Sequence, residues 1–254
     1  MRGNSMQDRY KTEKTKWDDI AERHFEDVEI LGPGEDFHKY ATSKIELTGV
    51  SEFLGDLHKK RVLEIGCGVG FVATLLAKSG AHVTVFDLSP VSVQVAKRRA
   101  EINNVKIDPL VSAGENLPFS DESFEIIFGK SILHHLDPGI ARQDVYRILC
   151  KGGKAVFVEP MGMNPVLTFV RKHVPYRYKN AVGVDRALTY DDMDAWTRNF
   201  QYRQYREVQL LSMVERGFGW GRKFPALRKM DEYLLKHFTF LRRFCRYAVI
   251  CAMK

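Results

Sequence analysis

The sequence predicts an α/β protein built on a doubly wound, mostly parallel sheet of seven strands. Two observations support this fold class. Short apolar segments alternate with helix-like segments between residues 61 and 160. Strands that alternate with helices in this way indicate parallel strands joined by right-handed crossovers. The strand segments are also apolar along their whole length, which is typical of a sheet covered by helices on both faces.

Local signals place each element of this alternation. Residues 61–65 form the first predicted strand and run straight into a glycine-rich turn. Gly80 ends the following helix as a C-terminal cap, and Pro90 suits the first turn of the next helix. The remaining strands are predicted at 82–86, 108–111, 124–128, 155–158, 208–214 and 244–253. The helices are predicted at 71–79, 89–102, 139–149 and 225–237.

The pattern along the chain divides it into a leader, a lid and a main domain. Residues 1–5 precede a second methionine and look like an added leader, so they take no part in the predicted fold. Residues 6–57 are expected to form a helical N-terminal lid, and residues 58–254 the main domain. Alternation stops after residue 160, so 161–204 are expected to be an irregular or helical insertion after the fifth strand. The helices expected in the lid cover 8–25 and 38–57.

Composition is that of a globular protein, with 44% hydrophobic and 28% charged residues among 254. No apolar run approaches the roughly 20 residues that a transmembrane helix needs, and the N-terminus lacks the apolar core of a signal peptide. The four cysteines have neither the close spacing of a zinc site nor the pattern of a disulfide framework, so reduced thiols and no metal are expected. We therefore expect a soluble, cytoplasmic protein.

Positive charge is concentrated in the C-terminal third. The formal net charge is +7, and residues 169–254 hold 18 of the 39 lysines and arginines but only 8 of the 32 acidic residues. This bias favours an anionic small-molecule acceptor or an acidic surface, although a solvated basic face explains it equally well. The basic residues are dispersed, so no nucleic-acid partner is expected. The oligomeric state stays open.

A glycine-rich turn at 66–70 joins the first strand to the first helix of the main domain, the place where open α/β sheets bind ligands. Glycine permits a tight turn and close approach of the backbone to a ligand, and the following helix offers free N–H groups. A dinucleotide-binding turn has its third glycine five residues after the first, where this chain has Phe71. Gly70 stands one position earlier, and Glu64 precedes the turn by two residues. The turn therefore departs from the dinucleotide pattern.

Asp87 ends the second predicted strand, 21 positions after Gly66. A carboxylate at this position can accept hydrogen bonds from both ribose hydroxyls of an adenosine. The alternative is a cap for the helix at 89–102, for which Ser89 is an equally good candidate. With the glycine turn one strand away, ribose binding is the favoured interpretation.

Several segments, in order, resemble the class I S-adenosylmethionine-dependent methyltransferases, in particular the small-molecule group similar to methyltransferase type 11. They are VLEIGCGVG at the glycine turn, Asp87, AGENLPFSDESFEIIF around the third and fourth strands, SILHHL after the fourth strand and ILCKGGKAVFVEP around the fifth. The resemblance is strong over about residues 61–160. It implies a Rossmann-like sheet with an antiparallel last strand, S-adenosylmethionine as cofactor and S-adenosylhomocysteine as its product.

The resemblance implies a role for residues in or beside the turns that follow the first four strands. Glu64 would order the glycine turn beside the cationic end of the cofactor, Asp87 would hold the ribose, and Leu88 would lie beside the adenine. Gly129 and Lys130 would flank the methionine part. The implied cofactor-binding residues are Glu64, Gly66, Cys67, Gly68, Gly70, Asp87, Leu88, Ala113, Gly114, Glu115, Gly129 and Lys130.

One part of the adenine site departs from the family pattern. The family usually has an aspartate and then a small residue before its E-x-L-P-F segment, and the aspartate reaches the adenine amine. Here these positions are Ala113 and Gly114. Backbone groups, or Glu115 or Ser112, are expected to take the place of the missing carboxylate.

Two histidines follow the fourth predicted strand and are the candidate general bases. A base is needed only if the acceptor must lose a proton, and histidine titrates close to neutral pH. His134 is the first candidate and His135 the second, while the alternative is that one ring of the LHHL run packs under the helix. Glu159, at the end of the fifth strand, is either an acceptor contact or an internal hydrogen-bonding group.

Aromatic side chains are expected to close the site. Tyr10, Trp17 and His38 are candidates within the lid. A second aromatic group falls at 169–205 and forms either an acceptor pocket or part of the core. Its members are Phe169, Tyr176, Tyr178, Tyr190, Trp196, Phe200, Tyr202 and Tyr205.

These features predict an enzyme that moves a methyl group from S-adenosylmethionine to a small molecule such as a natural-product, sugar or lipid intermediate. Oxygen or nitrogen is the expected acceptor atom, and carbon is less favoured. Two alternatives stay open: a methyltransferase that acts on RNA or protein, and a protein that binds the cofactor without catalysis. A nicotinamide oxidoreductase is the least favoured, because Phe71 stands where the third glycine belongs.

Overall fold

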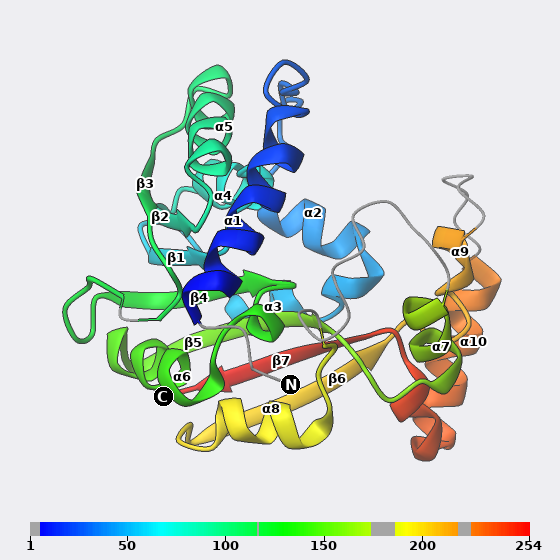
Figure 1. Ribbon diagram of the computed structural model, residues 1–254. Coiled ribbons are helices and arrows are strands. Elements are labelled where there is room, and N and C mark those ends of the chain that lie inside the picture. The colour runs from blue at the N-terminus through cyan, green and yellow to red at the C-terminus, as the bar shows by residue number, and fades with distance from the viewer. Residues whose placement is uncertain (1–5, 116, 174–185, 218–224) are drawn as a thin grey trace.

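A computed structural model describes residues 6–115, 117–173, 186–217 and 225–254 of the protein (Figure 1). The strands are β1 (Arg61–Ile65), β2 (His82–Asp87), β3 (Ile107–Val111), β4 (Phe124–Lys130), β5 (Leu149–Pro160), β6 (Tyr202–Val208) and β7 (Tyr247–Met253). The helices are α1 (Met6–Glu22), α2 (Phe37–Ser43), α3 (Val50–Leu54), α4 (Phe71–Lys78), α5 (Pro90–Ile102), α6 (Pro138–Ile148), α7 (Pro165–His173), α8 (Tyr190–Thr197), α9 (Val214–Gly217) and α10 (Pro225–His237).

The seven strands form one sheet in the order β3-β2-β1-β4-β5-β7-β6. The strands β1 to β5 pair in parallel, whereas β7 is antiparallel to both β5 and β6. The predicted fold class, a doubly wound sheet with an antiparallel last strand, is thus confirmed. The direction of winding reverses between β1 and β4, so the turns after these two strands border a common crevice.

Helices cover both faces of the sheet. The helices α2 to α5 pack on one face, and α6 and α8 on the other. Successive side chains of β4 point to opposite faces of the sheet. The ring of Phe128 packs against that of Phe37 on α2, with centroids 5.5 Å apart, while Ile127 packs in the core cluster on the other face together with Trp196. Phe128 and Ile127 are fully buried, and burying a side chain of this size stabilises the fold by about 1.5–3 kcal/mol.

The sixth strand begins at Tyr202, before the position predicted for it. The apolar run at 208–214 predicted a strand, but residues 210–212 form a turn instead. The N–H groups of these three residues donate to the carboxylate of Asp231 on α10, at 2.7 to 3.1 Å, so they are paired without a strand partner. The true β6 is polar because it is an edge strand whose side chains are mostly exposed.

The helix predicted at 38–57 is broken. A 3₁₀ turn at Ile45–Leu47 follows α2, and α3 begins only after Gly49. The backbone of Gly49 is left-handed, with a φ of +80°, a conformation that interrupts a helix. Val50 and Leu54 are buried all the same, so the apolar spacing alone did not reveal the break.

The helix α1 lies over the carboxyl edge of the sheet. It packs along α5 (Figure 1), and Asp18 of α1 accepts a hydrogen bond from the hydroxyl of Ser89, the N-cap of α5, at 2.5 Å. The segment expected as an insertion, 161–204, contains α7 and α8, and its residues 174–185 lie outside the described part of the chain. None of the helices in the described ranges combines the length and apolar character needed to span a bilayer.

Candidate active site

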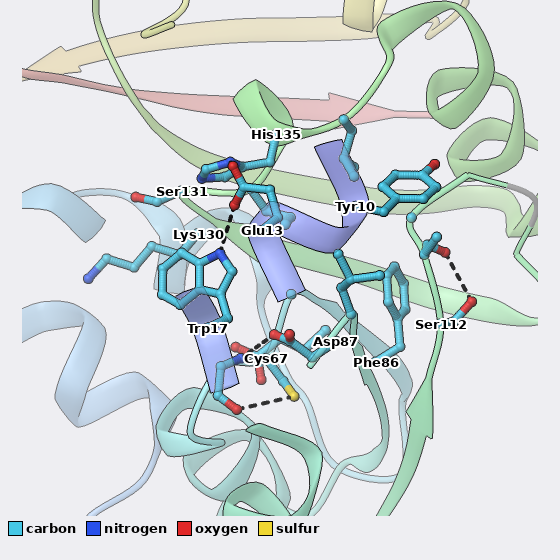
Figure 2. Close-up of a pocket in the computed structure, with 18 of the residues that line it drawn as sticks. Tyr10, Glu13, Trp17, Cys67, Phe86, Asp87, Ser112, Lys130, Ser131 and His135 are labelled. Atoms are coloured by element: carbon cyan, nitrogen blue, oxygen red, sulfur yellow. Dashed lines mark hydrogen bonds and ion pairs between the residues drawn. The ribbon is translucent and has the colours of Figure 1, made fainter. Parts of the chain in front are cut away.

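A cavity of about 270 Å³ lies at the carboxyl ends of β1 to β4, with α1 as its outer wall (Figure 2). Open parallel sheets bind ligands at this edge. Gly70, Gly129 and His134 are not among its lining residues. The predicted cofactor-site and base residues that do line it are Glu64, Gly66, Cys67, Gly68, Asp87, Leu88, Ser112, Ala113, Gly114, Glu115, Lys130 and His135.

The glycine turn is folded tightly against the end of β2. The N–H groups of Gly66 and Cys67 both donate to the carbonyl of Phe86, at 3.0 and 3.1 Å. Gly68 has a φ of +49°, and a Cβ placed on it would meet no atom within 4 Å. Gly68 therefore leaves bare backbone beside open space, which suits the close approach of a ligand.

Gly70 and Gly129 permit close packing. A Cβ on Gly70 would lie 2.5 Å from the Cα of Ala96, so this glycine lets α4 approach α5. A Cβ on Gly129 would lie 2.7 Å from the side chain of Ile132 and 2.9 Å from that of Phe157. Gly70 and Gly129 thus serve packing without lining the cavity, whereas Gly66 does both, since it lines the cavity and a Cβ on it would lie 2.6 Å from the side chain of Ile132.

Asp87 lies at the end of β2 and braces the glycine turn. One of its oxygens accepts the N–H of Gly68 and the other that of Ser89, each at 2.9 Å. The cap of α5 is Ser89, whose hydroxyl oxygen accepts the N–H of Ser92 at 3.0 Å, so the alternative role considered for Asp87 is filled by its neighbour. Burial raises the pKa of Asp87, and the N–H donors of Ser89 and Gly68 oppose that rise.

Glu64 is a buried acid with one unsatisfied oxygen. Its residue is 3% exposed, and Oε2 has no hydrogen-bond partner among the described residues. Burial raises the pKa of Glu64 well above its ordinary value; the N–H of Ala73 opposes the rise and the charge of Asp87 adds to it. A buried acceptor without a partner costs free energy. A cationic ligand beside this oxygen would remove that cost, so this end of the cavity suits a cation.

Glu115 connects the core to α1. Its carboxylate accepts hydrogen bonds from the guanidinium of Arg9 at 2.9 Å, the hydroxyl of Tyr10 at 2.6 Å and the N–H of Asp137 at 3.0 Å. Burial, together with the bond to Glu115, raises the pKa of Tyr10 to about 12. The carboxylate considered as a substitute for the missing acid at Ala113 is therefore engaged with the helix above it.

Four side chains of α1 line the cavity: Arg9, Tyr10, Glu13 and Trp17. Tyr10 and Trp17 were expected in the lid, whereas Arg9 and Glu13 were missed. Tyr10, Glu13 and Trp17 follow one another at spacings of three and four residues, and Arg9 stands four residues before Glu13. Such spacings put side chains on one face of a helix, and they were the signal available in the sequence. His38, the third aromatic expected in the lid, does not line the cavity.

The two histidines of the LHHL run have different surroundings. The Nδ1 of His134 lies 2.6 Å from an oxygen of Glu159. The same carboxylate is fully buried and accepts the consecutive N–H groups of residues 132–133, at 2.7 and 2.8 Å, so Glu159 orders the turn after β4. His135 lines the cavity, and Figure 2 shows its ring beside Glu13 of α1.

The aromatic group predicted at 169–205 supplies no described residue to the cavity lining. Trp196 and Phe200 are buried in the core cluster on the face covered by α6 and α8. Tyr176 and Tyr178 lie outside the described residues. For the buried pair, the core interpretation is the one that the packing favours.

Residues 63–157 match a family profile described as a methyltransferase domain. This segment carries the glycine turn, Asp87, the turn after β3 and the turn after β4, which together build most of the cavity. This segment is therefore a methyltransferase domain of the class I S-adenosylmethionine-dependent kind.

The curated relatives of this methyltransferase domain include ubiquinone biosynthesis O-methyltransferases. The chain is 34% identical over 136 residues to the one from Xanthomonas oryzae pv. oryzae, which covers 53% of this chain and 55% of the relative. It is 31% identical over 155 residues to the one from Alkalilimnicola ehrlichii, which covers 60% of each chain. The likeness thus spans little more than half the length of these relatives.

Solved structures share the fold of this protein over more of the chain. The geranyl diphosphate C-methyltransferase from Streptomyces coelicolor A3(2) gives a TM-score of 0.64 at 14% identity and covers 96% of this chain and 97% of its own. The cyclase SpnF gives a TM-score of 0.58 at 18% identity, over 85% of this chain and 80% of its own. At these identities the likeness concerns the fold alone, and proteins named for different reactions share it.

Proposed function

We propose that this methyltransferase binds S-adenosylmethionine in the cavity beneath α1 and transfers its methyl group to oxygen, or to nitrogen, of a small molecule. The observation that carries the proposal is the pair of buried acids, Glu64 and Asp87, beside one glycine turn. The unpartnered oxygen of Glu64 suits the cationic methionine part. A carboxylate oxygen accepts more than one hydrogen bond, so Asp87 can keep its two backbone donors and still accept ribose hydroxyls.

The charges around the cavity disfavour a dinucleotide. A pyrophosphate beside the glycine turn would lie near Glu64 and Asp87, and either acid would repel it when ionised. Among the described lining residues, the lysine and arginine side chains are already paired: Arg9 with Glu115 at 2.9 Å and Lys130 with Glu46 at 3.3 Å. A sulfonium donor meets no such repulsion, which supports S-adenosylmethionine over a nicotinamide cofactor.

A small acceptor is supported by the way the cavity is closed. The helix α1 covers it and is held to the core through the bonds of Arg9 and Tyr10 to Glu115, so a polymer would have to displace this helix to reach the site. Oxygen is favoured as the acceptor atom because the curated relatives are named O-methyltransferases. Among hydroxyl groups, a phenolic one gives up its proton most readily to a base such as the histidine at the cavity, so we propose a phenolic hydroxyl as the acceptor group.

When bound, S-adenosylmethionine supplies a methyl group on a cationic sulfur, activated for in-line displacement. The task of the chain is then to hold the donor and align the acceptor. Glu64 and Asp87 would fix the donor, and α1 would exclude water. His135, which lines the cavity, would accept the proton of the acceptor, a contribution of roughly 10²–10⁴-fold in rate for a positioned general base.

Calorimetry tests the cofactor, and a transfer assay tests the acceptor. S-adenosylmethionine and S-adenosylhomocysteine are expected to bind, and NAD is expected not to bind. With methyl-tritiated S-adenosylmethionine, label is expected in catechol and not in total RNA. Binding of NAD alone would contradict the assignment of S-adenosylmethionine as cofactor. Label in RNA but not in catechol would contradict the proposal of a small phenolic acceptor.

Binding of S-adenosylmethionine is expected to release a proton from Glu64. Burial raises the pKa of Glu64 in the free protein, and a cation beside the carboxylate lowers it. The complex therefore holds fewer protons than the free protein, so affinity must rise with pH until Glu64 is ionised in the free protein as well. Calorimetry in buffers of different ionisation enthalpy measures the proton released.

The variant Glu64→Gln is expected to lose most of this proton release and to bind S-adenosylmethionine about 10- to 100-fold more weakly, because a hydrogen bond to a charged group contributes roughly 1.5–3 kcal/mol. Glu52→Gln is the matched control, since Glu52 is an exposed acid on α3 that does not line the cavity. Undiminished proton release in Glu64→Gln would show that another group titrates on binding.

A further inference from the structure

One ring nitrogen of His135, Nδ1, is a buried atom whose hydrogen-bonding capacity is unsatisfied among the described residues. The side chain of His135 lines the cavity. An oxygen of Glu13, Oε1, lies 3.4 Å from this nitrogen. The two atoms are therefore within ion-pair distance although no aligned hydrogen bond joins them, and a small movement of α1 on ligand binding is enough to align them.

Glu13 is held in place by its own helix. Its Oε2 accepts the indole N–H of Trp17, one turn further along α1, at 3.0 Å, which leaves Oε1 on the side of His135 (Figure 2). Glu13 is 6% exposed. Burial opposes its ionisation, but the contact with His135, the N–H of Trp17 and the charge of Lys16 outweigh burial and lower the pKa of Glu13. Glu13 is thus a carboxylate at neutral pH.

The other neighbours of the His135 ring do not take the place of Glu13. The ring of His134 lies 4.1 Å away between centroids, but its Nδ1 is engaged with Glu159 at 2.6 Å. The ring of Trp17 meets His135 edge-on, with centroids 6.2 Å apart. Among the described residues, the carboxylate within ion-pair distance of His135 is that of Glu13.

We propose that Glu13 is a positioning residue for His135, an inference that rests on the proposed function. A carboxylate beside Nδ1 favours the tautomer that carries its proton on Nδ1, because the N–H can donate to it. The lone pair of Nε2 is then available to a proton. Without the carboxylate, either nitrogen can carry the proton, and the fraction of rings ready to act as a base falls.

The proton transfer then balances as follows. The acceptor oxygen forms a bond to the methyl carbon while the carbon–sulfur bond breaks and its electron pair stays on sulfur. The hydroxyl proton of the acceptor passes to Nε2 of His135, and the imidazolium so formed is stabilised by the carboxylate of Glu13. The proton returns to water when the product leaves. Because Glu13 belongs to α1 and His135 to the turn after β4, the pair is complete only while α1 is docked.

The tautomer of His135 tests this inference without an acceptor. In ¹⁵N NMR of the complex with S-adenosylhomocysteine, His135 is expected as the Nδ1–H tautomer, its signal assigned by its loss in His135→Asn. In Glu13→Gln, the amide oxygen is expected to accept the N–H of Trp17, so the amide N–H₂ faces His135. This N–H₂ donates to an unprotonated Nδ1, and the Nε2–H tautomer of His135 is therefore expected. Glu22→Gln is the matched control, because Glu22 is an exposed acid on the same helix.

Turnover gives the second measurement. In Glu13→Gln, kcat with catechol is expected to fall about 10- to 100-fold, part of the effect of a general base, while KM for S-adenosylmethionine changes less than about twofold. Glu13→Ala, which removes the carboxylate without adding an amide, is expected to give a mixture of tautomers and answers the same question should Glu13→Gln not fold.

The outcomes separate this inference from the proposed function. If the unaltered protein does not bind S-adenosylhomocysteine, the proposed function fails. If it binds the compound but the tautomer of His135 is the same with and without the Glu13 carboxylate, the inference is overturned while the proposed function stands. The expected change of tautomer together with no turnover of catechol would contradict only the phenolic acceptor.

Discussion

Replacing Asp87 by alanine is expected to weaken the binding of S-adenosylhomocysteine at least about 100-fold. In the proposed complex this carboxylate accepts both ribose hydroxyls, and each hydrogen bond to a charged group contributes roughly 1.5–3 kcal/mol, of which every 1.4 kcal/mol is a factor of ten in affinity. Asp87 also accepts the N–H groups of Gly68 and Ser89 at 2.9 Å, so the variant loosens the glycine turn as well. Isothermal titration calorimetry measures the affinity.

Two further variants separate ribose binding from support of the turn. Asp87→Asn keeps one acceptor oxygen and is expected to bind with intermediate affinity. Asp108→Ala removes an exposed acid from the neighbouring strand β3 and is expected to bind as the unaltered protein does. Circular dichroism checks that each variant is folded. Full affinity in a folded Asp87→Ala would mean that this carboxylate only supports the backbone of the turn.

Replacing Gly70 by alanine is expected to lower the free energy of unfolding by about 2 to 5 kcal/mol. The backbone of Gly70 has a φ of +72°, where a Cβ costs roughly 1–2 kcal/mol. The added Cβ would also lie 2.5 Å from the Cα and the Cβ of Ala96 on α5. Overpacking of this kind typically costs about 1–3 kcal/mol, and a helix backbone cannot move aside as a flexible side chain does. Urea denaturation measures the loss.

Gly68 offers the matched comparison within the same turn. Its φ is +49°, but a Cβ on it would meet no atom within 4 Å. Gly68→Ala should therefore cost only about 1–2 kcal/mol of backbone strain, while it places a methyl group beside the cavity and weakens cofactor binding. Equal losses of stability in the two variants would contradict the packing role assigned to Gly70.

Local patterns predicted the fold well where local and tertiary preferences agree. The strand at 61–65 and the helix at 225–237 have the predicted bounds, because their apolar spacing and end signals point to the same structure. The prediction was wrong at 208–214, where an apolar run marks a buried turn whose N–H groups pair with Asp231, a residue on a distant helix. No local pattern reports such a partner.

The candidate site shows the same division. The order of motifs identified the glycine turn, the acid after β2 and the turn after β4, and all of them border the cavity. Nothing local separated Gly68 from Gly70, because the difference lies in what each faces: open space in one case and Ala96 of α5 in the other. The roles of Arg9 and Glu13 depend on the docking of α1, more than 100 residues from Glu115 and His135 in sequence.

By itself, the sequence determined that the chain forms an alternating, mostly parallel sheet with a glycine turn and an acid on its carboxyl edge, since backbone conformation and burial follow from residue type and spacing. Only the tertiary structure decided which of these groups meet. His135 rather than His134 lies at the cavity, Glu159 accepts hydrogen bonds from the turn after β4, and Glu13 lies beside His135. The physical reason is that hydrogen bonds and charge pairs act over a few ångströms in space, whatever the distance along the chain.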